Sequence, residues 1–119
     1  MPIYDLFNYC GTMLAGAKTV EHPDARDLEL TDVLFAISDA ARLGIVQRLA
    51  SGPLDVARCQ PEDDPLPKST LSHHLKVLRL AGVVQSEPNG RQRTITLRRA
   101  DLDQRFPGLL DAILSAAGF

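Results

Sequence analysis

Residues 68–81, KSTLSHHLKVLRLA, decide the fold that this chain can adopt. Leu71, Leu75 and Leu78 follow the i, i+4, i+7 spacing that gathers apolar side chains on one face of a helix. Gly82 comes directly afterwards, and glycine readily adopts the left-handed conformation that ends many helices. The stretch therefore predicts an amphipathic helix with a polar outer face, which carries Ser69, Ser72, His73, Lys76 and Arg79.

After Gly82 the sequence changes to the two-residue period of β-strands. Two strands are predicted, over Val83–Glu87 and Arg91–Leu97, because apolar residues alternate with threonines in the second of them. Asn89-Gly90 lies between the two stretches and is a strong signal for a tight hairpin turn. A β-hairpin that carries arginines is therefore expected directly after the helix.

The flanking segments have helical spacing as well. Leu30–Ile37 predicts a one-sided helix, and Asp39 is a good N-cap for a second helix. Leu54–Cys59 is at most a short helix, because three prolines crowd the stretch that follows it. Asp101–Ala117 is expected to be helical, with Pro107-Gly108 splitting or restarting the helix.

We expect an N-terminal extension over residues 1–29 and a folded domain over residues 30–119. Apolar residues between Ile3 and Ala17 predict a short amphipathic helix, and Lys18–Glu29 has the polar composition of a linker. At 119 residues the chain has the size of one domain, and its 45% hydrophobic and 24% charged residues are typical of soluble proteins.

Three features of the sequence favour a cytoplasmic protein. No apolar run approaches the length of about 18 residues that a membrane span needs. No basic region precedes the first apolar residues, so a secretory signal is not expected. The two cysteines, Cys10 and Cys59, are too few for a disulfide framework, which makes a reducing compartment the default.

The charge of the chain is unevenly distributed. The formal net charge is −2, yet the stretch from Leu66 to Arg99 holds seven basic residues and one acid, Glu87. That stretch carries a charge of +6 and the remainder of the chain −8. Local positive charge favours a polyanion partner, although a solvated basic face without a partner is an equal alternative from charge alone.

The order of the predicted elements is that of a winged helix-turn-helix domain, a mainly α fold with a β-hairpin wing that belongs to the α+β class. A helix fits the major groove of DNA, and a basic hairpin can reach an adjacent groove or the phosphates. The alternative from another class is a winged-helix module that binds a protein. Acidic residues on the outer face of residues 68–81 would favour that alternative, and the sequence has none there.

Three motifs in this order resemble those of ArsR/SmtB-type transcriptional repressors. Residues 69–84, STLSHHLKVLRLAGVV, resemble the family's recognition helix, which often has the pattern S-T-x-S-x-H-L-x-x-L-x-x-A-G-[LV]. Residues 36–46, AISDAARLGIV, resemble the helix before it, and Gly90–Arg93 resembles the wing. The resemblance covers Leu30 to Leu114. It implies a homodimeric repressor that binds an inverted repeat in double-stranded DNA and is released by an unknown signal.

Two departures from the family pattern stand out. Ala40-Ala41 replaces the usual Pro-Thr, which is a minor change. The positioning helix before the recognition helix is broken by prolines, so its length and docking are open.

The resemblance and the polar face of the helix together give a candidate DNA-binding set. By the resemblance, His73 holds the family's groove-facing position and is expected to contact DNA, the alternative being a solvated side chain without a partner. A short hydroxyl such as that of Ser72 can reach base edges or phosphates, unless it caps the helix. Arg79 is expected at a phosphate or in a pair with an acid, and Arg91 and Arg93 are expected on one strand face. The set comprises Lys68, Ser69, Thr70, Ser72, His73, Lys76, Arg79, Arg91 and Arg93.

Four other polar residues are expected to have roles inside the domain. His74 matches the family's near-standard histidine, which packs and hydrogen-bonds within the fold. Arg42 either supports the DNA-facing side or forms a salt bridge. Arg98 and Arg99 are expected only to flank the last helix.

The family pairs its first and last helices in a dimer, and the resemblance implies the same pairing here. The apolar residues of Leu30–Ile37 and Leu109–Leu114 exceed what one small core needs. The predicted dimer interface comprises Leu30, Val33, Leu34, Leu109, Leu110, Ile113 and Leu114.

The sequence lacks the two metal sites for which the family is best known. The thiol site needs Cys-x-Cys near the short helix, where Cys59 stands alone, and the other site needs histidines in residues 101–119, which contain none. No metal and no cofactor are therefore expected. Cys10 could still reach Cys59 of the partner subunit, as N-terminal arms do in some relatives, and the two thiols could then form a redox-switchable disulfide or an incomplete metal site. Against this, Cys10 lies on an apolar helical stripe, where a buried, inert thiol is expected.

The sequence does not predict an enzyme. It lacks the G-x-S-x-G, H-E-x-x-H, phosphate-loop and dinucleotide motifs. Ser72 and His73 are neighbours on a helix, so their side chains diverge by about 100° and cannot pair as nucleophile and base.

Overall fold

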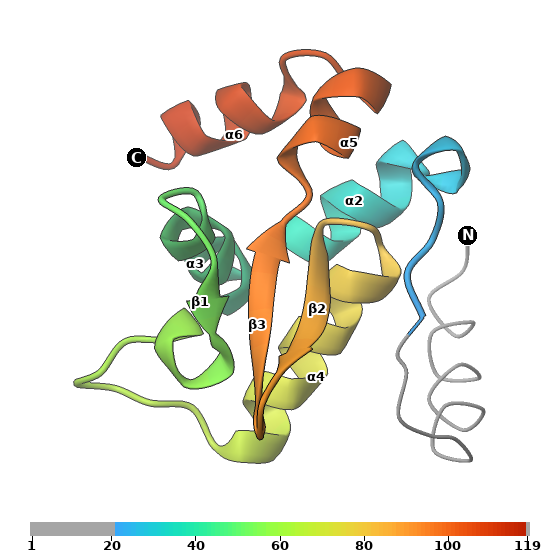
Figure 1. The fold of residues 1–119 in the computed structure, drawn as a ribbon. Coiled ribbons are helices and arrows are strands. Elements are labelled where there is room, and N and C mark those ends of the chain that lie inside the picture. The colour runs from blue at the N-terminus through green and yellow to red at the C-terminus, as the bar shows by residue number, and fades with distance from the viewer. Residues whose placement is uncertain (1–20, 119) are drawn as a thin grey trace.

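The computed structural model describes residues 21–118, so the predicted helix between Ile3 and Ala17 lies outside the described residues, as does Cys10. Figure 1 shows helices combined with an antiparallel sheet, which confirms the predicted α+β class. The elements are the 3-10 helix η1 (Ala25–Asp27), α2 (Leu30–Ile37), α3 (Ala40–Leu49), β1 (Leu54–Asp55), the 3-10 helix η2 (Val56–Cys59), α4 (Lys68–Leu80), β2 (Val84–Asn89), β3 (Gln92–Leu97), α5 (Arg99–Arg105) and α6 (Leu109–Ala116).

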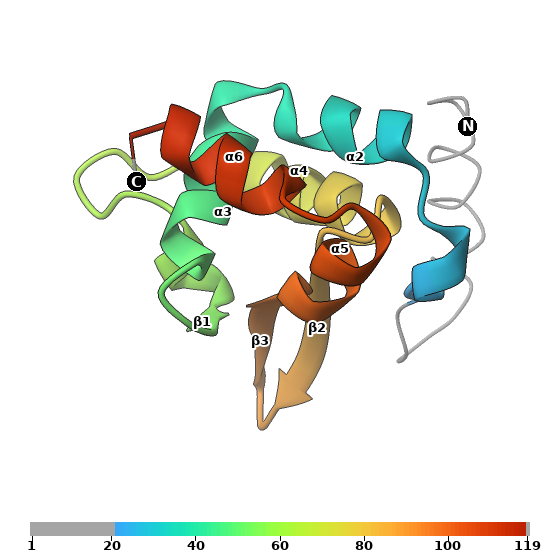
Figure 2. The same ribbon diagram turned by 90° about the horizontal axis from the view of Figure 1, so that it is seen from above.

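The wing is a regular antiparallel hairpin of β2 and β3. Asn89 pairs with Gln92, so the two-residue loop is Gly90-Arg91 and not the predicted Asn89-Gly90. Gly90 has a φ of 66°, a left-handed conformation that glycine adopts at no steric cost, and it therefore suits the first loop position. Figure 2 shows the hairpin projecting away from the layer of helices.

The sheet has a further strand, β1, which the sequence did not predict. In the order β1-β3-β2, Leu54 pairs with Ile95 and Asp55 pairs with Thr94. The prediction of at most a short helix is right for Val56–Cys59, a 3-10 helix, and wrong for the two residues before it. Two residues are too few to display the alternation by which a strand is identified.

The apolar face of α4 packs into the core, as its spacing predicts, and Leu71, Leu75 and Leu78 are buried. The helix ends in a Schellman motif, in which the N–H of Val83 donates to the carbonyl oxygen of Leu78 at 2.9 Å. Gly82 adopts a φ of 88° there. A Cβ at Gly82 would also clash with the buried side chain of Leu28, so two independent constraints require glycine.

α3 begins where the sequence predicts, because Asp39 caps it. The carboxylate oxygen Oδ2 of Asp39 accepts from the backbone N–H of Ala41 at 2.9 Å and from that of Arg42 at 3.1 Å. The hydrogen bond from the Arg42 backbone is the largest cause that lowers the pKa of Asp39. The junction between α2 and α3 is therefore fixed by a charged cap.

The predicted break at Pro107-Gly108 separates α5 from α6. Gly108 has a φ of 80°, and α6 then turns back so that Leu110 and Leu114 reach the core. Between residues 21 and 118, the structure contains no helix with the length and apolar character needed to cross a bilayer.

Residues 21–29 are not the free polar linker that their composition predicts. The side chain of Leu28 is 2% exposed and belongs to the core, and Nε of Arg105 donates to its carbonyl oxygen at 3.1 Å. A domain boundary at residue 30 would therefore cut through the packed body. We name residues 21–28 the strap.

Candidate nucleic-acid interface

The outer face of α4 carries most of the predicted DNA-binding residues. Because Leu71, Leu75 and Leu78 turn inward, the opposite side of the helix is left accessible. The N-cap is Pro67 and makes no side-chain cap bond, so the hydroxyls of the first turn do not cap the helix. Lys68, Ser69, Ser72 and His73 are exposed, and Thr70 and Lys76 are half-buried.

His74 lies beside this face and is tied to the neighbouring helix. The Arg42 NH1 and the Nδ1 of His74 are 3.1 Å apart, and Nε of Arg42 donates to the carbonyl oxygen of Ala36 at 2.6 Å. The Arg42 guanidinium also lies 5.4 Å from the ring centroid of Phe35. Burial, followed by the Arg42 charge, lowers the pKa of His74, while Asp39 opposes them. The internal role expected of His74 agrees with these contacts, and Arg42 joins α2, α3 and α4.

The two wing arginines differ in accessibility. Arg91 lies in the hairpin loop and is exposed, whereas Arg93 lies on β3 and is half-buried. Nε of Arg93 donates to Oγ of Ser86 at 2.6 Å, and its NH2 donates to the carbonyl oxygen of Ser86 at 3.0 Å. The prediction that both arginines share one strand face is therefore wrong, because the loop begins one residue later than expected.

Arg79 is a correction to the predicted set. Its side chain is not on the accessible face, since the residue is only 6% exposed, and its NH1 donates to the carbonyl oxygen of Glu21 at 2.6 Å. The predicted spacing put Arg79 on the polar side of the helix, but the strap covers that end of α4. Arg79 is therefore neither an accessible phosphate ligand nor evidence for a basic surface.

The arginines after β3 are both paired with carboxylates of the same chain, Arg98 in the interior and Arg99 at the surface. Arg98 is 9% exposed and pairs with Asp101 at 2.9 Å, and Arg99 pairs with Asp111 at 2.9 Å. These contacts agree with the expectation that both residues flank the last helix. The charge of +6 between Leu66 and Arg99 thus overstates the accessible basic surface, which reduces to Lys68, Lys76 and Arg91 with a partial contribution from Arg93.

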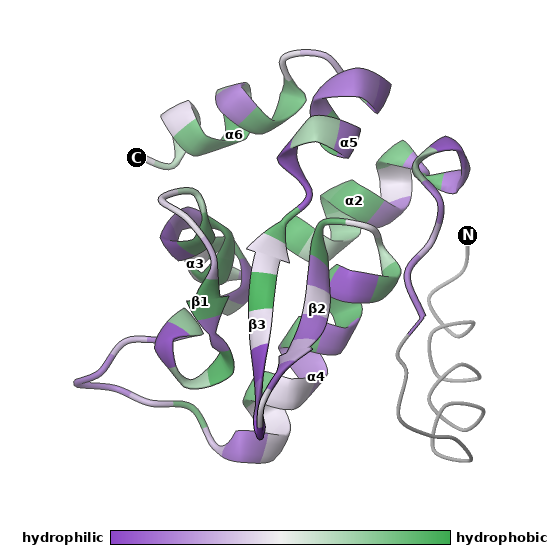
Figure 3. Cartoon of the chain, viewed as in Figure 1, coloured by the Kyte–Doolittle hydropathy of each residue, from purple (hydrophilic) through white to green (hydrophobic). Residues whose placement is uncertain are grey.

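The predicted dimer interface also needs correction. Val33, Leu110 and Leu114 are 1%, 2% and 4% exposed and lie in the core of a single chain. The polarity of neighbouring positions could not separate inward from outward residues, because both helices are apolar over most of their length, as Figure 3 shows. Leu30 and Leu34 are exposed, Leu109 and Ile113 are half-buried, and Phe35, which the sequence did not single out, is 41% exposed.

Cys59 has the environment of an inert thiol. It is fully buried in the core, and its Sγ lies 3.5 Å from the carbonyl oxygen of Asp55, to which it donates. Burial, with a smaller contribution from the Asp55 carboxylate, raises the pKa of the thiol to about 11. In the part of the chain that the structure describes, His, Cys, Asp and Glu side chains form no group of three or more that could hold a metal ion.

The comparisons with known proteins agree with this geometry. Residues 65–86, which include α4, match the family model described as "Bacterial regulatory protein, arsR family". The HTH-type transcriptional regulator Rv2034 of Mycobacterium tuberculosis is 40% identical over 76 residues, which cover 58% of this chain and 70% of that protein. The chain belongs to the ArsR family of transcriptional regulators.

Other relatives of this ArsR-family regulator cover more of the chain. The HTH-type transcriptional regulator YceK of Bacillus subtilis is 29% identical over 82 residues, which cover 68% of this chain and 82% of that protein. A solved structure of a possible transcriptional regulator for arsenical resistance is 31% identical, with a TM-score of 0.56, and the match covers 72% of this chain and 92% of that one. The transcriptional repressor BigR of Xylella fastidiosa, 23% identical, shares the fold with a TM-score of 0.58 over 98% of this chain and 96% of its own.

Proposed function

We propose that this ArsR-family regulator is a cytoplasmic repressor that binds a double-stranded DNA operator as a homodimer. An unknown signal releases it from DNA, without the family's usual metal sites. The outer face of α4 carries the proposal. Ser72 and His73 are exposed at its centre, Lys68 and Lys76 lie toward either side, and the helix contains no acidic residue. Such a face suits the major groove, where base edges are read between two rows of phosphates.

The side chains divide into two classes by chemistry. Ser72 and His73 have hydrogen-bonding groups suited to base edges, and we assign them to sequence recognition. Lys68 and Lys76 are assigned to phosphates, where a positive charge binds without regard to sequence. Arg91, at the loop of a hairpin that projects from the helical layer, is assigned to the phosphates or the minor groove beside the helix.

A two-fold dimer would present α4 twice. Its operator is then an inverted repeat whose half-sites lie about 34 Å apart, one helical turn, or a multiple of that. Leu30, Leu34 and Phe35 of α2 are exposed apolar residues, and Leu109 and Ile113 of α6 are half-buried. These five residues support a surface on which the second subunit pairs.

Titration of two duplexes tests the DNA assignment. An operator selected from a random duplex library and a scrambled duplex are each titrated at two salt concentrations. His73→Ala should weaken the binding free energy by roughly 1–3 kcal/mol, mainly on the operator duplex. Lys76→Ala should weaken both duplexes alike and reduce the salt slope by about one phosphate charge per half-site. Arg26→Ala, at an arginine whose side chain is 85% exposed on η1, is the charge-matched control and should change neither.

Three outcomes would revise the assignment. If His73→Ala weakens both duplexes equally, His73 joins the phosphate class. If Lys76→Ala acts only on the operator, Lys76 instead reads a base. If the wild-type protein binds no duplex, the winged-helix surface serves another partner, and the protein-interaction alternative replaces the proposal.

The dimer is tested by a charge on the outer side of α2. Leu34→Asp places a carboxylate in the proposed pairing surface without entering the core, since Leu34 is 44% exposed. Light scattering should then report a monomer with an unchanged circular dichroism spectrum. A dimer that persists in this variant would show that α2 does not pair. Leu110→Asp is unsuitable as a test, because Leu110 lies in the core and its replacement would unfold the chain.

The thiol-based alternative has less support. A redox sensor needs an accessible thiolate, whereas Cys59 is buried and its thiol pKa is raised to about 11. Oxidation of Cys59 by peroxide is therefore not expected to release the operator. Zinc, cadmium and arsenite should leave operator affinity unchanged, because the sequence offers no complete set of metal ligands. If peroxide does release the operator, and if replacing Cys10 and Cys59 by serine abolishes that release, the redox alternative would replace the unknown signal.

A further inference from the structure

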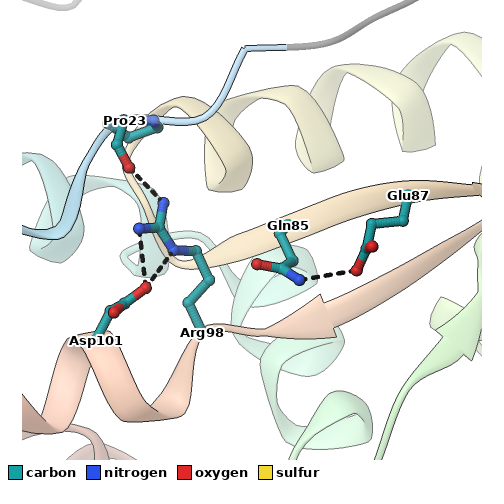
Figure 4. A network of polar contacts seen from close by, with 5 residues as sticks. All are labelled: Pro23, Gln85, Glu87, Arg98 and Asp101. Atoms are coloured by element: carbon teal, nitrogen blue, oxygen red, sulfur yellow. Dashed lines mark hydrogen bonds and ion pairs between the residues drawn. The ribbon is translucent and has the colours of Figure 1, made fainter.

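The strap joins parts of the domain that are far apart in the sequence. NH1 of Arg79, on α4, donates to the carbonyl oxygen of Glu21 at 2.6 Å, and NH1 of Arg98, which follows β3, donates to that of Pro23 at 2.8 Å. Arg98 also pairs with Asp101 of α5, as Figure 4 shows. Because both arginines are more than nine-tenths buried, their contacts hold the strap against the end of α4 and the base of the wing.

Between these two contacts, His22 reaches the edge of the wing. β2 is an outer strand of the sheet, and the backbone N–H of Ser86 on β2 donates to Nε2 of His22 at 3.0 Å. Ser86 is only 9% exposed. Its Oγ and its carbonyl oxygen accept from Arg93 on β3. His22, Ser86 and Arg93 therefore form a continuous chain of hydrogen bonds from the strap to both strands of the wing.

The bond from Ser86 requires a neutral imidazole at His22. A protonated imidazole donates through both nitrogens and cannot accept, so protonation would leave a nearly buried N–H facing a second donor. A positive charge at His22 would also be repelled by the arginines nearby, while Glu87, which accepts from Gln85 at 2.9 Å (Figure 4), would attract it. The charged groups of the described residues that act on His22 are Arg79 of α4, Glu87 of β2, Arg93 of β3 and Arg98 before α5.

These surroundings set the direction of the pH effect. His22 is exposed as a whole residue, but partial desolvation of its ring lowers the pKa of His22 below its ordinary value of 6.5, and the charges of Arg79, Arg98 and Arg93 lower it further against the opposing charge of Glu87. A folded-state pKa below the unfolded one means that the contact contributes fully above pH 6.5. Its contribution is lost as the pH falls through the lowered pKa.

We propose that His22 is a positioning residue for the wing and a pH-sensitive latch. In its neutral form it fastens the strap to Ser86 and so holds Arg93 and the outer strand in the geometry that the DNA-binding face needs. When protonated it releases Ser86, and the outer strand β2 loses its hydrogen bond to the strap, while the contact of Arg98 with Pro23 at the base of the wing remains. The consequence for DNA rests on the proposed function, whereas the latch itself does not.

The latch is tested first without DNA. The full chain is titrated by NMR from about pH 8 to about pH 5, and three signals are followed: the His22 ring, the Ser86 amide and the Nε–H of Arg93. All three should move with one midpoint, below that of an exposed histidine. In His22→Gln, whose amide oxygen can accept but does not titrate, the Ser86 and Arg93 signals should stay in place over the same range. If the Ser86 amide of the wild-type chain does not follow the His22 ring, the latch is refuted without recourse to any variant.

DNA binding gives the second readout. The probe is a mixed-sequence duplex of about 30 base pairs, long enough for two half-sites. His73→Gln is introduced both into the wild-type chain and into His22→Gln, so that neither protein presents an imidazole to the DNA at position 73 and the two proteins differ at His22 alone. Between about pH 8 and about pH 5, the protein that keeps His22 should lose about threefold to tenfold more affinity than the protein that carries His22→Gln, the change expected for one net hydrogen bond.

The outcomes separate the latch from the proposed function. Equal pH profiles of DNA affinity in the two proteins, with tight binding at pH 8, would overturn the positioning role. A chain that binds no duplex at any pH would overturn the proposed function, while a common midpoint for His22, Ser86 and Arg93 would still support the latch. A larger loss of affinity in the protein that keeps His22 supports both.

Discussion

Lys76 and Arg79 stand three positions apart on α4, and the structure uses their positive charges in opposite ways. Lys76 lies on the outer face, whereas Arg79 is 6% exposed and donates to the carbonyl oxygen of Glu21 at 2.6 Å. The outer face of the helix is thus accessible from Lys68 as far as Lys76, and the last turn is enclosed by the strap. The difference teaches that a count of basic residues overestimates a DNA-binding surface wherever a second segment covers part of it.

Substitution at the enclosed end of α4 is expected to have the largest effect on the free energy of unfolding. Gly82→Ala should destabilise the protein by about 2–4 kcal/mol, because the new Cβ meets the buried Leu28 and the backbone has a φ of 88°. Gly90→Ala is the matched control, since Gly90 also has a positive φ but nothing lies within 4 Å of the added Cβ. That variant should lose only about 1 kcal/mol.

Urea denaturation of the two glycine variants measures the difference. Leu28→Ala, combined with Gly82→Ala, should be less destabilised than the sum of the single variants, because the smaller side chain makes room for the Cβ. Equal losses of unfolding free energy in Gly82→Ala and Gly90→Ala would mean that Leu28 of the strap does not pack closely against Gly82.

The two basic residues of the comparison can be set against each other directly. Arg79→Met should lower the free energy of unfolding by about 2–3 kcal/mol, because it removes a buried charge-assisted hydrogen bond to the strap and leaves the carbonyl of Glu21 without that donor. Lys76→Met should change it by less than about 0.5 kcal/mol, as is usual on an accessible face. Thermal unfolding of both variants provides the check, and a loss in Lys76→Met as large as that in Arg79→Met would contradict the division of α4.

The sequence predicted the elements whose signals are local. The leucine spacing of α4, the capping carboxylate of Asp39 and the break at Pro107-Gly108 all act within a few residues, and the structure confirms each of them. The three motifs of the ArsR family identified the remaining order of elements. These features were predictable because each is determined by a neighbour along the chain.

The misses share a different cause, which is contact between distant segments. The strap is polar in composition, and nothing in residues 21–28 indicates that their carbonyls bind arginines more than fifty positions away. The burial of Arg79, the short strand β1 beside Ile95 and the hydrogen bonds of Ser86 depend on such long-range packing. The sequence held one clue to the strap, since Leu28 is an apolar residue in a polar stretch, whereas the second requirement for Gly82 appears only from its contact with Leu28 in the structure.

The wing repeats the comparison on a smaller scale. Arg91 is exposed in the loop, while Arg93 is held by two hydrogen bonds to Ser86. On a mixed-sequence duplex, Arg91→Ala should reduce the salt slope by about one phosphate charge per half-site and leave the unfolding free energy within about 0.5 kcal/mol of the wild type. Arg93→Ala should do the reverse, with a smaller change of slope and a loss of about 1 kcal/mol in stability, since Ser86 loses its donors. Salt-dependent titration and urea denaturation of both variants measure the two quantities. If Arg93→Ala changes the slope as much as Arg91→Ala and costs no stability, the guanidinium leaves Ser86 for a phosphate when DNA binds, and Arg93 belongs with the accessible basic residues.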